Sequence, residues 1–304
     1  MICDCVSFFN ELEILEIRLH ELDSVVDRFV IVEAPYTHQG NPKPLYFKNN
    51  EERFKPWLHK IRYFSVDFPA DLEAQCRAGL YSGDSQIHQL QKLDMNWARE
   101  RYQRNEIMRG LTDCKADDTI TICDLDEIPS ANSIRLHERH HGVRTLNMLS
   151  FYYYLNLKVG EWNGPAKILP YDLLVASTPS NVRNMSVPSL PGSSGWHYSY
   201  MGGPKHIVQK IKSFAHAEYN TANTSEEGIS HMLDTGLEVH GRPGFNYSNY
   251  TVYPEYVEKN KALFENLGFI RYPIIHSWTP NSPIPRPVPS ESLPHNSGPY
   301  RPAC

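Results

Sequence analysis

The 304-residue sequence lacks several features that would assign it to a class at once. No run approaches the roughly 20 consecutive apolar residues that a membrane-spanning helix needs. The N-terminus has no basic segment followed by an apolar one, so it does not resemble a secretory signal peptide. No internal repeat is visible, which argues against a solenoid or a propeller. From these absences we expect a soluble, cytoplasmic protein with no membrane span.

The sequence also has no excess of basic residues and no cysteine spacing typical of a metal site. The chain has 30 Lys and Arg against 35 Asp and Glu, a formal charge of −5. Nucleic acids attract basic surfaces, so we expect no nucleic-acid partner. The six cysteines form no Cys-x-x-Cys pair and no zinc-type Cys/His spacing. Three of them lie in strand-like apolar runs, and we expect Cys3, Cys5 and Cys123 to be buried and reduced.

What the sequence does contain is enough apolar material for a sizeable core. Hydrophobic residues make up 40% of the chain, and aromatic residues 12%. The first segment has the pattern of a strand, a helix and a strand, over residues 1–7, 10–22 and 28–33. Leucines spaced three and four apart predict the helix, and Asn10 with Glu13 is expected to cap it. Such a unit forms a right-handed crossover between parallel strands.

Later segments extend the same pattern. Further strands are predicted at 61–66, 119–123 and 143–156, and helices at 89–111, 130–140, from Pro204 onward, 225–234 and 254–267. Residues 160–203 are rich in Gly and Pro and are expected to be largely irregular. We predict an α/β fold with one domain over 1–278, made of a nucleotide-binding half (1–130) and an acceptor and catalytic half (131–278). Prolines concentrate near the C-terminus, so 279–304 is expected to be a disordered tail.

The most informative segment is TITICDLDEIP, residues 119–129, in which an apolar strand leads into three acids. Because side chains alternate along a strand, Asp124 and Asp126 would point the same way. Two close carboxylates repel unless a cation lies between them, and Mg²⁺ or Mn²⁺ fits oxygen ligands best. At the carboxyl end of a parallel strand, that ion could hold a nucleotide diphosphate. An acidic surface turn, or a helix start capped by Ser130, would give the same pattern.

Two further segments offer polar groups for a nucleotide. The loop after the second strand could cradle one with Glu33, Thr37, Gly40 and Lys43. On the helix before the acidic strand, Arg104 could grip a phosphate with two parallel hydrogen bonds, beside Asn105. An ordinary connecting loop and a solvated helical face are the alternative interpretations of these two segments.

A third segment is suited to a sugar. In GSSGWHYSYMGG, residues 192–203, glycines flank Trp196 and His197, and sugars stack on aromatic rings in loops that can close over them. The run SFAHAEY adds His216, a candidate for a metal shell or a phosphate contact, and Glu218. A structural role for each of these side chains is the alternative.

Taken together, the runs FFNELEILEIRL, VDRFVIVEAPYTHQGNPKPLYF, CDLDEIPS, GWHYSYMGG and SFAHAEYN resemble glycosyltransferase family 17. These enzymes are β-1,4-mannosyl-glycoprotein β-1,4-N-acetylglucosaminyltransferases, and the resemblance covers residues 1 to about 278. It implies a GT-A-type, Rossmann-like nucleotide-sugar-binding domain with a mostly parallel central sheet. It also implies UDP-N-acetylglucosamine (UDP-GlcNAc) as donor, a mannose-containing glycan or glycoprotein as acceptor, a divalent metal and inversion at the anomeric carbon.

On this resemblance, Asp124 and Asp126 are the Asp-x-Asp pair, and Glu33 begins part of the donor site. Animal members carry an N-terminal anchor and stem that this sequence lacks, so the acceptor could be another glycan. The predicted reaction is an in-line displacement in which a carboxylate takes the acceptor proton. Glu218 is the first candidate for this base and Asp172 the second.

Two other function classes stay open. The run DLDE after an apolar strand also resembles phosphatases with an aspartyl nucleophile, although such motifs usually lie on the first strand of the domain. A glycan-binding pseudo-enzyme could keep the fold and the aromatic loop without turnover. Metal-dependent UDP binding favours the transferase over the phosphatase, and a turnover assay separates the transferase from the binder.

Overall fold

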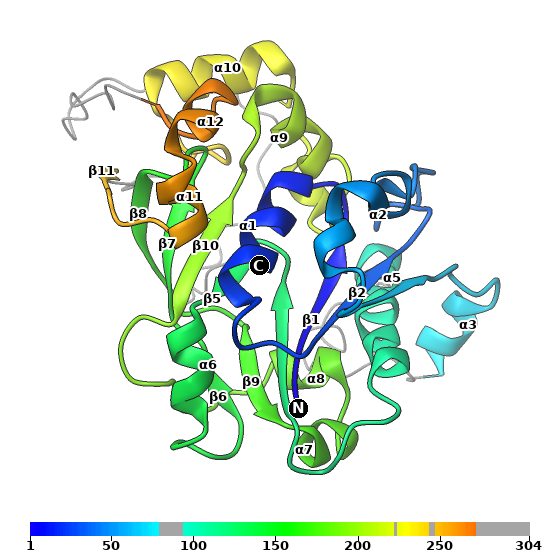
Figure 1. Ribbon diagram of the computed structural model, residues 1–304. Helices are drawn as coiled ribbons and strands as arrows, with labels where there is room; N and C mark the ends of the chain where they lie inside the picture. The colour runs from blue at the N-terminus through cyan, green and yellow to red at the C-terminus, as the bar shows by residue number, and fades with distance from the viewer. Residues whose placement is uncertain (79–93, 222–223, 243–246, 272–304) are drawn as a thin grey trace.

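The computed structural model describes residues 1–78, 94–221, 224–242 and 247–271, and these form two sheets (Figure 1). The first sheet has the order β3 (Ile61–Ser65), β2 (Arg28–Glu33), β1 (Ile2–Phe8), β4 (Thr119–Asp124), β9 (Lys167–Pro170) and β6 (Arg144–Thr145). The second has the order β11 (Ser248–Asn249), β8 (Leu157–Trp162), β7 (Met148–Tyr152), β10 (Gly195–Ser199) and β5 (Glu127–Pro129).

Both sheets are mixed. Strands β3, β2, β1 and β4 run parallel, whereas β9 is antiparallel to β4 and β6 to β9. In the second sheet β7 and β10 pair in parallel, and the other pairs are antiparallel. The predicted α/β class is therefore confirmed. In the first sheet, parallel pairing joins the four neighbouring strands β3, β2, β1 and β4, and the two remaining pairs are antiparallel.

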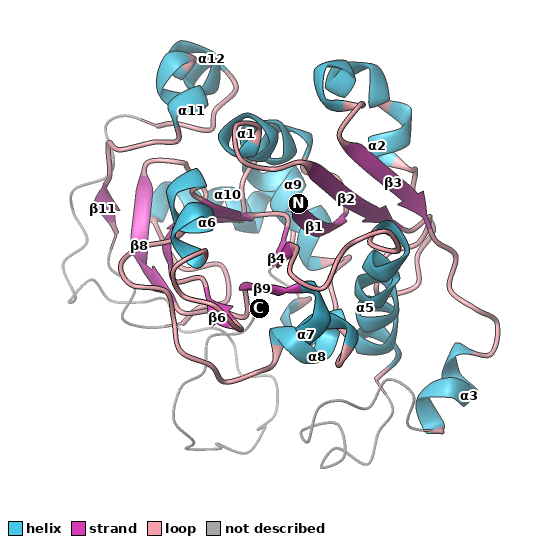
Figure 2. Cartoon of the chain, turned by 60° about the horizontal axis from the view of Figure 1, so that its bottom comes forward, coloured by secondary structure: helices cyan, strands magenta, loops and turns pink. Residues whose placement is uncertain are grey.

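Helices cover both faces of the first sheet because its strands are apolar on both sides. Val6 of β1 packs into the core cluster that contains the inner residues of α1 (Leu12–Leu22). Cys3 and Cys5 of the same strand point the other way. They pack toward η2 (Glu106–Gly110), next to α5 (Met95–Asn105), which lies against the opposite face (Figure 2). Cys3, Cys5 and Cys123 are buried and free, as predicted.

The remaining helical segments are short. They are α2 (Tyr46–Asn49), η1 (Glu51–Trp57), α3 (Leu72–Arg77), α6 (Ala131–His137), α7 (Tyr171–Val175), α8 (Pro179–Arg183), α9 (Gly203–Ile211), η3 (Ala217–Tyr219), α10 (Glu226–Thr235), α11 (Glu255–Lys259) and α12 (Lys261–Asn266). Among the described residues, none of the helices is long and apolar enough to cross a membrane. The predicted tail over 279–304 lies outside the described residues.

Two helix predictions were wrong in detail. The predicted cap at Asn10 is absent: α1 begins after Glu11 with no side-chain cap, and Asn10 instead donates to Gln209 Oε1 at 3.0 Å. A tertiary partner therefore takes the amide that a local cap would have used. The helix expected over 89–111 is α5, which starts after the capping residue Asp94 and tightens into η2. Residues 89–93 lie outside the described part.

The prediction of irregular structure over 160–203 was also wrong, because strands β9 and β10 and the second half of β8 lie there. The single strand expected over 143–156 is divided into β6 and β7. Glycine marks a close approach of two strands here rather than a loop. A Cβ on Gly195 would lie 2.1 Å from the carbonyl oxygen of Ile128 in the paired strand β5.

Candidate active site

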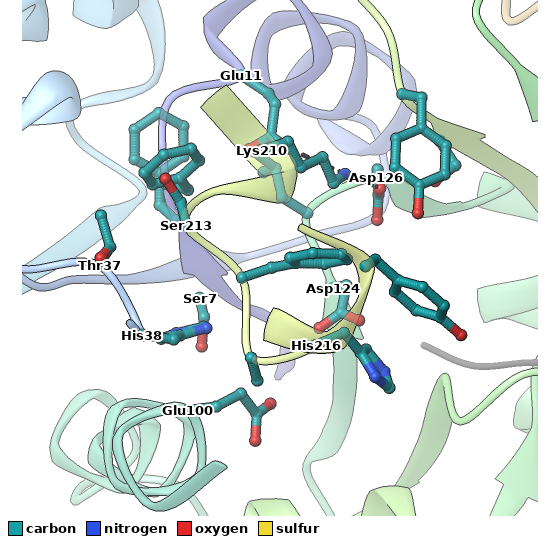
Figure 3. A pocket seen from close by; sticks show the side chains of 18 of the residues that line it. Ser7, Glu11, Thr37, His38, Glu100, Asp124, Asp126, Lys210, Ser213 and His216 are labelled. Carbon is teal, nitrogen blue, oxygen red and sulfur yellow. Dashed lines mark hydrogen bonds and ion pairs between the residues drawn. The ribbon is translucent and has the colours of Figure 1, made fainter. Parts of the chain in front are cut away.

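A cavity lies where parallel strands of the first sheet end (Figure 3). Ser7 near the end of β1 and Asp124 at the end of β4 are register partners, and both line it. Tyr152 at the end of β7 and Ser199 at the end of β10 line it from the second sheet. Carboxyl ends of parallel strands are where ligands bind in α/β folds, so the position itself marks a candidate site.

Asp124 faces the cavity between two arginines. Its Oδ1 accepts from Arg104 Nη1 at 3.0 Å, and its Oδ2 accepts from Arg183 Nη2 at 2.6 Å. Burial by itself would raise the pKa of Asp124, but the charges of Arg183 and Arg104 outweigh it and lower that pKa. Asp124 is therefore ionised at neutral pH and keeps 31% of its side chain exposed.

Asp126 faces the same cavity and contacts a lysine. Lys210 Nζ of α9 donates to Asp126 Oδ2 at 2.6 Å and to Glu11 Oε1 at 3.1 Å. Burial by itself would lower the pKa of Lys210, but the charges of Asp126 and Glu11 raise it. The other carboxylate oxygen, Oδ1, lies 3.8 Å from His197 Nε2, beyond hydrogen-bond range.

The loop that carries these two acids is held in place by Arg18. This arginine of α1 is fully buried and pairs with Asp4 of β1, Nη2 to Oδ1, at 2.6 Å. Its Nη1 donates to the backbone carbonyls of Asp124, Leu125 and Glu127. Sequence analysis missed this pair, although opposite charges inside an apolar strand and an apolar helical stripe were a usable signal.

A second buried acid ties the loop to the second sheet. Glu127 accepts from Arg183 Nη1 at 2.6 Å, from Trp162 Nε1 at 2.8 Å and from the backbone N–H of Asp124 at 2.6 Å. Trp162 in turn stacks on His197, with ring centroids 4.1 Å apart. Arg183, Trp162 and Lys210 come from distant segments, and nothing near the acidic motif in the sequence pointed to them.

The loop after β2 divides into residues that reach the cavity and residues that do not. Thr37 and Lys43 line it. Glu33 is fully buried and accepts from the backbone N–H groups of Tyr46 and Phe47 and from Lys43 Nζ. Its carboxylate thus serves the start of α2. Gly40 has a φ of +87° and does not line the cavity; it lies against the Arg99 guanidinium.

The same loop is fastened to the segment after α9. The His38 backbone N–H donates to Ser213 O at 3.0 Å, and Gln39 Nε2 donates to the carbonyls of Ile211 and Phe214. The His38 ring lines the cavity near Gln103 Oε1, and burial lowers its pKa. His38 was not among the predicted site residues.

The other residues predicted to contact the nucleotide or the sugar also divide into those that line the cavity and those that do not. Arg104 and His197 line the cavity. Asn105 does not: its Oδ1 accepts from the Ser180 backbone N–H at 3.0 Å. Trp196, next to His197 on β10, points to the opposite side of the strand and packs against the hydrophobic core. Burial lowers the pKa of His197, and its Nδ1 has no hydrogen-bond partner in the described part of the chain.

The predicted proton acceptors lie in very different places. His216 lines the cavity, and its Nδ1 contacts Glu218 Oε1 at 2.6 Å. Glu218 is 59% exposed and does not itself line the cavity. Asp172 is exposed on α7, directly after β9, whose end pairs with Thr119 at the start of β4. Asp172 therefore lies at the opposite edge of the sheet, roughly 17 Å from Asp124 along β4.

We tested whether these side chains fit a divalent metal. Within 1–78, 94–221, 224–242 and 247–271, no three His, Cys, Asp or Glu side chains are grouped to hold one, so His216 does not join the Asp pair. Mg²⁺, however, typically uses one or two carboxylates together with substrate phosphates. The ion pairs around the site join five carboxylates to three cations, a formal charge of −2: Glu11, Glu100, Asp124, Asp126 and Glu127 with Arg104, Arg183 and Lys210. That excess suits a divalent ion at Asp124 and Asp126.

Comparison with known proteins gives a consistent result. Beta-1,4-mannosyl-glycoprotein 4-beta-N-acetylglucosaminyltransferases from Rattus norvegicus and Homo sapiens are 27% identical over 148 residues, and that from Mus musculus is 26% identical. Each match covers 46% of this chain and 24% of the relative, so the chain matches about a quarter of each relative's length. No solved structure matches significantly. The model of glycosyltransferase family 17 matches residues 1–242, and the chain belongs to that family.

Proposed function

We propose that this chain transfers N-acetylglucosamine from UDP-GlcNAc to a mannose-containing glycan, forming a β-1,4 linkage with inversion. Family membership and the relatives' names support the transferred sugar and the acceptor class. The observation that carries the proposal is the cavity at the strand ends, which contains Asp124, Asp126, Arg104 and Lys210 together. The proposal includes a GT-A-type domain, with its nucleotide-binding part formed by β1 to β4.

The donor diphosphate needs positive charge around it as it leaves. Arg104 and Lys210 line the cavity, and their positively charged side chains are available to the diphosphate. Asp124 and Asp126 would hold a Mn²⁺ or Mg²⁺ ion, which would neutralise the diphosphate when bound. Thr37, His38 and Lys43 also line the cavity and are proposed to contact the nucleotide.

In the proposed reaction, the acceptor hydroxyl oxygen attacks C1 of N-acetylglucosamine. The C1–O bond to the β-phosphate breaks, UDP departs with the electron pair, and the acceptor proton passes to a base. We assign this base to the His216–Glu218 pair, because His216 lines the cavity and Glu218 orients its ring through Nδ1. Glu218, our first candidate from the sequence, then acts through His216, and Asp172 is too far away.

The test combines binding and turnover on the intact chain. We expect UDP to bind in calorimetry more tightly with Mn²⁺ than without it, and a glycan array to accept labelled N-acetylglucosamine from UDP-GlcNAc. Asp126→Ala should lower transfer by at least about 10²-fold with the fold intact, since a carboxylate proposed to hold the metal ion that neutralises the diphosphate is lost. Asp113→Ala is the matched control, because Asp113 bridges Arg28 and Arg62 outside the cavity.

Three outcomes of this test would contradict or limit the proposal. Wild-type turnover in Asp126→Ala, with metal present, would reject the assignment of the metal site. UDP binding with no transfer to any glycan would favour the glycan-binding alternative. Loss of transfer in Asp113→Ala equal to that in Asp126→Ala would show that the effect is not specific to the cavity.

A further inference from the structure

The cavity has a second wall whose chemistry differs from that of the acids. This wall, here called the aromatic wall, consists of Tyr152, Tyr200, Tyr219, His240 and Arg242. Its members come from the ends of β7 and β10, from η3 and from the segment after α10. None of them was predicted as a site residue from the sequence.

The rings of the aromatic wall are fixed by one another. Tyr219 stacks on His240 with centroids 3.9 Å apart and planes 26° apart. The Tyr200 hydroxyl lies 2.6 Å from His240 Nε2, and Tyr200 meets Tyr152 edge to face at 5.3 Å. Arg242 Nη2 donates to the Tyr152 hydroxyl at 2.9 Å. Aromatic surface and hydrogen-bonding groups therefore alternate along this side of the cavity.

The wall carries no net charge at neutral pH. Burial lowers the pKa of His240 to about 4, which keeps its ring neutral. The positive charge of Arg242 is balanced by Glu238, whose Oε1 accepts from Nη2 at 2.5 Å. A diphosphate gains little from such a surface, whereas a neutral sugar can stack on a ring and hydrogen-bond to the groups beside it.

Backbone strain places one of these rings. Tyr200 has a φ of +57°, in the left-handed region that non-glycine residues rarely adopt. Residues held in this region concentrate at ligand sites. Here the unfavourable backbone carries the Tyr200 ring into the cavity, directly after β10.

We propose that the aromatic wall is the binding subsite for a neutral acceptor sugar, with Tyr219 as its stacking platform. Tyr219 and its stacking partner His240 are both partly exposed, while Tyr152 and Tyr200 are each only 7% exposed. This inference rests on the proposed transferase function, which places the nucleotide beside Asp124 and Asp126. The two ligands then meet between the walls, beside His216.

The experiment is saturation-transfer NMR on the full chain, loaded with UDP and Mg²⁺. The probes are the methyl glycosides of mannose, N-acetylglucosamine, galactose and glucose. We expect at least one glycoside to receive saturation from the wild type and to lose at least about 80% of it in Tyr219→Ala. UDP signals should persist in both proteins.

The matched control is Tyr256→Ala. Tyr256 also stacks on a histidine, His20, at 3.7 Å, but it lies on α11 and does not line the cavity. Glycoside binding should survive this change. Retained binding in Tyr219→Ala, equal loss in both variants, or no glycoside binding to the UDP-loaded wild type would overturn the inference. Failure of UDP itself to bind would instead reject the proposed function. In that case, glycoside binding measured without UDP would test by itself whether the aromatic wall binds a sugar.

Discussion

The two walls of the cavity stabilise their buried polar groups in different ways. On the first wall, here called the ionic wall, Asp124 stays charged because Arg104 and Arg183 lie against it, and Asp126 is paired with Lys210. On the aromatic wall, the polar groups are neutral or balanced in pairs, and rings provide most of the surface. A cavity with one ionic side and one neutral side suits a reaction that joins an anionic donor to an uncharged acceptor.

The comparison also concerns rigidity. The ionic wall is anchored in the first sheet, where Arg18 bonds to three carbonyls of the acidic loop. The aromatic wall is assembled from short segments and held through ring contacts and single hydrogen bonds. Removing an anchoring side chain should therefore lower the stability of the ionic wall more than removing one lowers the stability of the aromatic wall.

The largest effect is expected from Arg18→Met. It leaves Asp4 buried without a counter-charge and removes the bonds that hold the acidic loop, so we expect a loss of about 3–5 kcal/mol in the free energy of unfolding. Urea unfolding measures it. Arg53→Met is the control, because its pairs with Glu13 and Glu16 are partly exposed and should contribute less than about 1 kcal/mol. Equal losses in the two variants would refute the anchoring role.

A smaller effect is expected in the strand pair β5 and β10. Gly195 has a φ of +146°, and an added Cβ would meet backbone atoms of Ile128, Pro129 and Ser130. Gly195→Ala should therefore cost about 2–3 kcal/mol, because the β5–β10 pair must separate. Gly142→Ala also adds a Cβ at positive φ but has nothing within 4 Å, and it should cost only about 1 kcal/mol. Thermal unfolding of both variants gives the difference.

The smallest effect is a pH dependence that distinguishes the walls. The folded-state pKa of His240 is about 4, below the unfolded value of about 6.5, so only the unfolded chain takes up this proton between those pH values. Stability should fall by an amount on the order of 1 kcal/mol as the pH drops through that window, since the ring is partly exposed and screened.

The charge of Asp124 on the ionic wall should not change in the same window. Because the pKa of Asp124 is lowered, its stabilising charge is present above the unfolded value of about 3.9 and is lost only as the pH falls further. Unfolding of the wild type, His240→Gln and Asp124→Asn between pH 7 and 4 tests this. The wild-type advantage over His240→Gln should shrink toward pH 4, and the advantage over Asp124→Asn should not. The reverse pattern would contradict the comparison.

Sequence patterns predicted the parts of the site that depend on local order. Asp124 and Asp126 line the same cavity, as expected, although Leu125 and Asp126 form a turn rather than a continuation of the strand. The partners of these acids could not be predicted in the same way. Arg183 is 59 residues from Asp124, and Lys210 is 84 residues from Asp126. Nothing in a local pattern determines which distant cation packs against a given carboxylate.

The carboxylates at the ends of β2 and β4, the strands on either side of β1, show the limit most clearly. From the sequence, Glu33 of β2 and Asp124 of β4 were both candidates for contact with a nucleotide. In the structure, Glu33 is surrounded by N–H groups at the start of α2 and by Lys43 and has no exposed surface, whereas Asp124 opens to the cavity. Burial and the supply of local donors separated them, and both are tertiary properties.

The sequence by itself determined the α/β class, the parallel strands at the start of the chain and the position of the acidic pair, because alternation and helical periodicity are local. Only the tertiary structure decided which polar groups are used up inside the fold and which face the cavity. It also brought the rings of Tyr200, Tyr219 and His240 together from three separate segments. The physical reason is that desolvation and pairing depend on neighbours that are distant in the chain.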